Sequence, residues 1–202
     1  MRSWSKASPE DFQRLELEAH RILEGVPLHD VWRVSLSGGG SGRTISDVRD
    51  VMAFETLADI NPIVRFLFGL RSRLGKLFGW DAPRQGMSDS SELERVPSEL
   101  RERSTLPPGS ADGPFIVLYA LEQEAVSAIR NATVHAFSVL ALEPTPSGYH
   151  LFWAIFVEPV APLTGAYMAL IAPFRRFLVY PAILSHVHRR WAERFGGEVA
   201  HE

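Results

Sequence analysis

Two titratable side chains in the second half of the chain have the types needed for acid–base chemistry. His135 and Glu158 flank the turn-forming segment 144–148, which reads Pro-Thr-Pro-Ser-Gly. A hairpin closed by this turn would bring the two residues close together on adjacent strands. A histidine beside a carboxylate can act as a general acid–base pair. It can equally be a partly buried structural pair, which is the favoured interpretation.

A glycine-rich run at residues 37–44 is the second candidate site. It lies between a predicted strand and a predicted helix, where successive backbone amides can bind an anion. The residues concerned are Gly39, Gly40, Ser41, Gly42 and Arg43. The run departs from the P-loop pattern, because Ser37 and Arg43 stand where that pattern has its first glycine and its lysine. A flexible strand-to-helix turn is therefore favoured, with anion binding as the alternative.

Composition argues against several other classes of site. The chain has no cysteine, which excludes disulfides, zinc–thiolate sites, iron–sulfur clusters and a thiol nucleophile. His186 and His188 are two residues apart on a predicted helix and point about 200° away from each other, so they do not form a metal pair. The net charge of −3 does not favour a nucleic-acid binder. We expect no metal and no cofactor.

The hydropathy pattern predicts a cytoplasmic protein. No apolar leader segment is present at the N-terminus, and no stretch supplies about 20 uninterrupted apolar residues for a membrane span. A helix predicted at residues 62–80 is basic on one side and could lie on an anionic membrane surface. We expect it to pack its apolar side on the core instead, which disfavours peripheral membrane contact.

The elements that must position these residues change character along the chain. An N-terminal helical arm is expected over residues 1–30, followed by a single domain over residues 31–197. Helical periodicity dominates the front half. Alternation typical of a strand marks residues 31–36 as the first strand. It returns at 115–121, 125–129, 133–142 and 149–157. Short turns join these later strands, which predicts an antiparallel sheet.

Two further segments complete the predicted domain. Residues 81–114 are rich in serine, proline, glycine and charge, with a broken helix interrupted by Pro97, and are interpreted as a mobile loop or lid. A long apolar helix is expected to start near Leu163 and to end before Gly196, bent by Pro173 and Pro181.

Strands 115–121 and 151–157 are apolar on both faces. An antiparallel sheet covered on one face alternates apolar and polar residues, so both faces of this sheet must be covered. The C-terminal helix is expected on one face. The front-half helices, a partner or a bound apolar ligand would cover the other.

Three segments carry a resemblance to a known family. Residues 62–80, 131–135 and 165–177 resemble the bacterial family called domain of unknown function 2867, over roughly residues 31–191. That family resembles the START-like, polyketide-cyclase-like helix-grip superfamily (SRPBCC). The resemblance implies an α+β helix-grip fold: a curved antiparallel sheet on a long C-terminal helix, with helices inserted after the first strand. Members often have histidine after Pro-Phe, where this chain has Arg175, and the family has no assigned catalytic residues.

A cavity between sheet and C-terminal helix is what this resemblance implies for function. Its expected lining is apolar with one basic residue: Phe137, Val139, Phe152, Trp153, Phe156, Tyr167, Ile171, Phe174 and Arg175. Pockets of this kind bind small lipophilic molecules. The leading hypothesis is a non-catalytic binding module for a small hydrophobic or amphipathic ligand. The alternatives are a cyclase- or hydrolase-type enzyme in the same cavity, using His135 and Glu158, and an interaction protein that forms a homodimer through its sheet.

Overall fold

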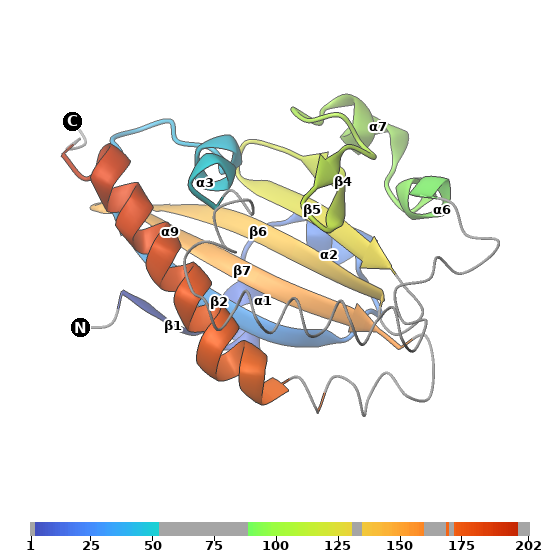
Figure 1. The fold of residues 1–202 in the computed structure, drawn as a ribbon. Coiled ribbons are helices and arrows are strands. Elements are labelled where there is room, and N and C mark those ends of the chain that lie inside the picture. Colours follow the sequence, from blue (N-terminus) through green and yellow to red (C-terminus); the bar gives the residue numbers. More distant parts are fainter. Residues whose placement is uncertain (1–2, 53–88, 131–134, 160–168, 170–171, 198–202) are drawn as a thin grey trace.

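One open, curved antiparallel sheet organises the chain (Figure 1). The computed structural model describes residues 3–52, 89–130, 135–159, 169 and 172–197. Seven strands lie in the order β1-β2-β7-β6-β5-β4-β3. Their bounds are β1 Trp4–Lys6, β2 Leu28–Ser37, β3 Ala111–Asp112, β4 Phe115–Ala120, β5 Glu124–Arg130, β6 His135–Thr145 and β7 Gly148–Glu158. The predicted strands and their antiparallel pairing are confirmed within these bounds.

The central hairpin of β6 and β7 fixes the register of the sheet. Its strands pair from Thr145 opposite Gly148 to His135 opposite Glu158. Gly148 has φ +143°, and a Cβ at this position would collide with the carbonyl oxygen of Leu36 on the neighbouring strand β2. Only glycine therefore closes this turn against β2. The register predicted from the segment 144–148 is confirmed.

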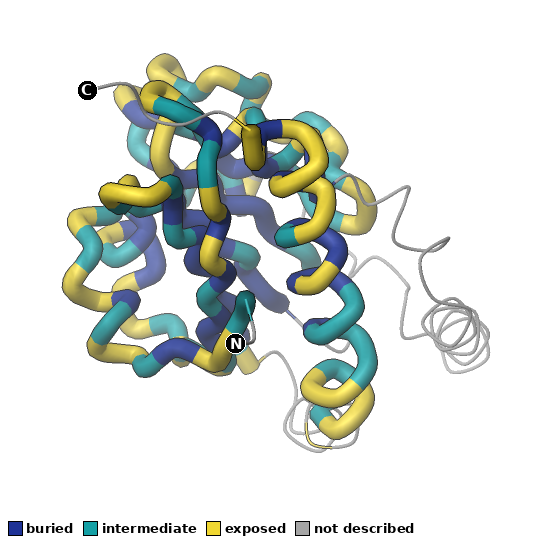
Figure 2. The backbone as a smooth tube through the Cα atoms, turned by 90° about the vertical axis from the view of Figure 1, so that its left-hand side faces the viewer, coloured by how far each residue is buried: buried dark blue, intermediate teal, exposed yellow. Residues whose placement is uncertain are grey.

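Helices cover both faces of the sheet. On one face lie α3 (Ile45–Met52) and α9 (Tyr180–Phe195), which contact each other. On the other lie α1 (Pro9–Gln13) and α2 (Glu18–Ile22), while α6 (Asp89–Glu94) and α7 (Ser98–Glu102) pack against β4. The strands in the middle are buried and the outer sides of the helices are exposed (Figure 2).

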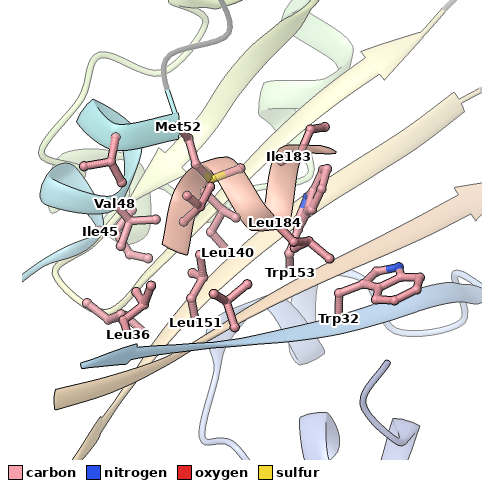
Figure 3. Packing of buried hydrophobic residues seen from close by; sticks show 14 of the residues in the cluster. Trp32, Leu36, Ile45, Val48, Met52, Leu140, Leu151, Trp153, Ile183 and Leu184 are labelled. Atoms are coloured by element: carbon pink, nitrogen blue, oxygen red, sulfur yellow. The ribbon is translucent and has the colours of Figure 1, made fainter. Parts of the chain in front are cut away.

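The pleat of the strands divides the interior into two cores. The α9-side core takes residues such as Leu36, Leu151 and Ile183 from β2, β7 and α9 (Figure 3). The α1-side core takes Phe12, Phe137 and others from α1, the sheet and α7. Strands β6 and β7 contribute alternate residues to each core, whereas β4 sends both Leu118 and Tyr119 into the α1-side core at a shift in its register. The double cover expected from the sequence is confirmed, and helices provide it.

Capping residues set the starts of two helices. Ser8 Oγ accepts a hydrogen bond from the Asp11 amide at 3.0 Å, and Pro9 opens α1. Asp47 Oδ2 accepts from the Thr44 amide at 2.9 Å at the start of α3. Both patterns supply partners for amides that the first helical turn leaves free. Pro97 separates α6 from α7, as its missing amide hydrogen predicts.

A π-helical turn precedes α9. It spans Arg175–Val179, and the Tyr180 amide donates to the carbonyl of Arg175, five residues earlier. Pro181 follows directly. A proline removes one hydrogen bond and its ring clashes with the carbonyl four residues before it, so the helix widens locally. The predicted start of this helix near Leu163 lies outside the described residues.

The predicted N-terminal arm is integrated with the sheet. Strand β1 pairs with β2 through Trp4, Ser5 and Lys6, and Phe12 is fully buried in the α1-side core. In the segment predicted as a loop or lid, residues 89–114 carry two helices and a short strand, and Val96 and Leu100 are buried. Through these contacts residues 3–30 and 89–114 pack on the same sheet.

Candidate functional site

His135 and Glu158 lie side by side, as the hairpin register predicts. The distance from His135 Nδ1 to Glu158 Oε2 is 2.8 Å. The second ring nitrogen, Nε2, lies 2.9 Å from Glu92 Oε2, a contact that joins helix α6 to strand β6. Sequence spacing gave no indication of Glu92, because 43 positions separate it from His135.

Arginines complete this charged cluster. Arg130 donates to Glu92 Oε1 at 2.8 Å, and Arg95 donates to Glu158 Oε2 at 3.2 Å. Burial acts to raise the pKa of Glu92, but hydrogen bonds from His135 and Arg130 outweigh it and lower that pKa to about 2. Glu92 is therefore ionised and only accepts hydrogen bonds.

The side chain of His135 is enclosed by its neighbours. Its side chain is 1% exposed and its ring lies 4.5 Å from that of Phe137, centroid to centroid. Its Nδ1 contact with Glu158 is close but lacks the alignment of a hydrogen bond. The hollow at Ser127 and Ser138 and a shallow one at residues 15–21 are both lined by other residues. An acid–base catalyst must reach its substrate, so this geometry does not support the enzyme alternative.

The predicted cavity lining is divided between the two faces of the sheet. Four of its members belong to the α1-side core: Phe137, Val139, Phe152 and Phe156. Trp153 belongs to the α9-side core. Successive residues of a strand point to opposite faces, so Phe152 and Trp153 cannot line one cavity. The predicted lining is corrected in this respect, because α9 faces only Trp153 of these five residues.

The remaining predicted lining residues come from the C-terminal segment. Tyr167 and Ile171 lie outside the described residues. Phe174 is 46% exposed. Arg175 donates to Asp30 Oδ2 at 3.0 Å, and Tyr180 donates to the same oxygen at 3.1 Å. Arg175 is thus already paired with a carboxylate at the start of β2.

The glycine-rich loop is tied to its surroundings by its own backbone. The amides of Gly38 and Gly39 donate to the carbonyls of Ser147 and Phe195, at 2.9 Å and 3.0 Å. Arg43 donates from Nε to the Gly39 carbonyl at 2.8 Å, and its guanidinium lies 4.1 Å from the centroid of the Phe195 ring.

Tyr149 adds to these ties, since its hydroxyl accepts from the Arg43 amide at 3.1 Å and donates to the Gly40 carbonyl at 3.0 Å. Two amides and the guanidinium that an anion would use thus have internal partners. This favours the structural turn over the anion site, and none of these ties involves Ser41 or Gly42.

A small hollow opens on the α9 side of the sheet, between α3 and strands β3 to β6. Its volume is about 60 Å³. It is lined by polar and apolar side chains: Arg49, Met52, Asp112, Phe115, Ala125, Ser127, Ser138 and Leu140. Asp112 Oδ2 accepts from Arg49 at 2.8 Å and from Ser127 Oγ at 3.0 Å. Ser127 and Ser138 are direct cross-strand partners.

Trp153 connects this hollow to the Asp30 ion pair. Its indole N–H donates to Ser138 Oγ at 2.9 Å, and its ring meets that of Tyr180 edge to face at 5.4 Å between centroids. Neighbouring side chains thus form a row across the sheet, which we call the polar strip: Arg49, Ser127, Ser138, Trp153, Tyr180 and Arg175. It crosses a sheet face that is otherwise an apolar core. Sequence reasoning missed the strip, although Ser127 and Ser138 each interrupt an apolar strand.

Among the described residues, no group of three or more histidine, aspartate or glutamate side chains is arranged to hold a metal ion. Within the same part of the chain, no helix combines the length and apolar character needed to cross a membrane.

Fold and site together define an α+β domain with a curved, open antiparallel sheet and a C-terminal helix. A family model described as "Protein of unknown function (DUF2867)" matches residues 22–182. The match covers most of the chain, and the chain belongs to this family. No curated protein and no solved structure matches it significantly.

Proposed function

We propose that the chain is a non-catalytic binding module for a small amphipathic molecule, held on the α9 side of a helix-grip sheet. The observation that carries the proposal is the hollow at Ser127 and Ser138. It places hydroxyl groups and an Arg49–Asp112 ion pair on a sheet face whose other residues form a core. Binding sites combine an apolar lining with a few placed polar groups.

The size of the hollow defines what enters it. A volume of about 60 Å³ is far below the roughly 300–1,000 Å³ of pockets that enclose a drug-sized ligand. This is room for a hydroxyl, carbonyl or amide group rather than for a whole ligand. The apolar part of the molecule would then lie along Leu140 and Trp153, whose side chains share this face.

The same geometry weighs against the two alternatives. In the proposed acid–base pair, His135 contacts Glu92 and lies beside Phe137 of the α1-side core. The polar strip lies on the other face of the sheet. A homodimer through the sheet would need an open face or a long edge. Helices cover both faces in the described part of the chain, and the edge strands β1 and β3 have three and two residues.

Native mass spectrometry of protein purified under mild conditions from its own cells tests the proposal. We expect a bound small molecule whose occupancy falls at least about tenfold in Ser127→Val, which removes a hydroxyl and fills the hollow. Ser98→Val, at an exposed serine of α7, is the matched control and should keep the ligand.

Protein that is empty from cells, and that shows no thermal shift with medium-chain alcohols, amides or acids, would refute the proposal. Circular dichroism of each variant separates loss of binding from loss of folding.

A further inference from the structure

Three buried N–H donors on the α9 side have no acceptor in the described part of the chain: Trp32 Nε1, Arg175 Nε and Trp191 Nε1. The first two lie in one region. Trp32 Nε1 and Arg175 Nε are both inaccessible to solvent and neither donates a hydrogen bond. Trp32 is 5% exposed as a residue. A buried polar group without a partner destabilises the fold, and such groups are rare in folded proteins. Two donors of the same kind in one region indicate a missing acceptor.

Tyr180 places the two donors in the same region. The Trp32 ring lies 5.1 Å from the Tyr180 ring, centroid to centroid, and the Arg175 guanidinium carbon lies 5.7 Å from the same ring. In Figure 3 the Trp32 indole stands on β2, on the side of the sheet that carries Trp153 and α9. Trp32 and Trp153 are direct partners across β2 and β7, so the donors lie at one end of the polar strip.

The charges around these donors favour an anion. Asp30 is the carboxylate of this group, and it is paired with Arg175 at 3.0 Å and with Lys6 at 3.8 Å. His29 lies 3.9 Å from Asp30. Burial, followed by the charge of Arg175, lowers the pKa of His29, so the ring is neutral at pH 7. Two cations and one anion leave one net positive charge among these groups.

A cationic ligand fits this end of the strip less well. Tryptophan and tyrosine rings can hold a cation over their faces, but the guanidinium of Arg175 already lies near the Tyr180 ring. A second cation would meet Arg175 and Lys6 and would leave both N–H donors without an acceptor. A carboxylate satisfies the donors and the charge together.

We propose that the amphipathic ligand is a carboxylic acid whose carboxylate accepts hydrogen bonds from Trp32 Nε1 and Arg175 Nε. This inference rests on the proposed function and names the ligand class. Trp153 then lies between the carboxylate end and the hollow, since it contacts Tyr180 on one side and Ser138 on the other.

Titration of the ¹⁵N-labelled full chain with decanoate, decanol and decyltrimethylammonium tests the inference. The Trp32 indole signal is assigned from Trp32→Phe, which keeps an aromatic ring and removes the N–H. We expect decanoate to move this signal and to bind at least about tenfold more tightly than decanol. Trp32→Phe should bring decanoate down to the affinity of decanol. Trp191→Phe is the control, because the Trp191 ring packs against Tyr149 and Phe195 near the C-terminal end of α9.

The outcomes separate the inference from the proposed function. Equal binding of decanoate and decanol, or a Trp32 signal that decanoate leaves in place, overturns the carboxylate site and leaves the binding module standing. Tighter binding of decyltrimethylammonium also overturns it, in favour of a cation. No binding of any probe, with empty protein from cells, overturns both proposals. The comparison of the three probes on the wild-type chain decides the inference even where Trp32→Phe fails to fold.

Discussion

Replacing Glu92 by glutamine should destabilise the fold at neutral pH and much less in acid. Glu92 is buried on α6, where it accepts hydrogen bonds from His135 at 2.9 Å and from Arg130 at 2.8 Å. The glutamine side chain would keep the shape of Glu92 but would lack its charge and one acceptor. His135 and Arg130 would each lose a charge-assisted hydrogen bond.

The magnitude follows from the pKa of Glu92. A fall of this pKa from 4.5 to about 2 corresponds to at most about 3 kcal/mol. The partners reach solvent in part, with the Arg130 side chain 26% exposed, so screening reduces this value. We expect Glu92→Gln to lower the free energy of unfolding by about 1–3 kcal/mol at pH 7.

The sign of the pH dependence is also fixed. A carboxyl group whose pKa is lowered in the folded state stabilises the fold fully above its ordinary pKa. This stabilisation is lost as the pH falls through the folded value. For Glu92 the loss occurs between about pH 4.5 and about pH 2. The difference between wild type and Glu92→Gln should therefore shrink across this window.

Urea denaturation followed by far-UV circular dichroism at pH 7, 5, 4 and 3 measures this difference. Glu94→Gln is the control, because it removes the same charge from an exposed position of the same helix, where changes are usually within about 0.5 kcal/mol. Equal stability of wild type and Glu92→Gln at pH 7, or a difference that does not change with pH, would refute the reasoning.

Three further predictions concern other parts of the fold. Burial raises the pKa of Glu124 in the folded state. The contribution of this carboxyl group to stability is therefore lost as the pH rises toward its folded-state pKa. Glu124→Gln should gain stability relative to wild type between pH 4 and pH 8 in urea denaturation, and the exposed Glu122→Gln should not. Gly39→Ala should lower the melting temperature more than Gly42→Ala, because both have positive φ but only at Gly39 would a Cβ lie 3.0 Å from a tryptophan ring; equal shifts would contradict this. Phe137→Ala should cost about 3–5 kcal/mol of unfolding free energy, since the side chain is fully buried, and a loss below about 1 kcal/mol would contradict its place in the core.

The sequence determined the features that depend on neighbouring residues. Alternation and short turns located β4 to β7, and the turn at Gly148 set the register that places His135 opposite Glu158. Ser8 and Asp47 cap helices that begin within three residues of them. Apolar character on both faces of the strands was sufficient to require cover on both sides, because a buried strand must lose its polar face.

Tertiary structure decided which distant groups meet. Alternation along a strand assigns Phe152 and Trp153 to opposite faces, but the face that receives α9 depends on packing between segments that are far apart in the chain. Glu92 reaches His135, and Arg175 reaches Asp30 across 145 positions, only after the sheet has formed. The polar strip arises for the same reason: Ser127, Ser138 and Trp153 share a face because of inter-strand register, which no single segment of the sequence encodes.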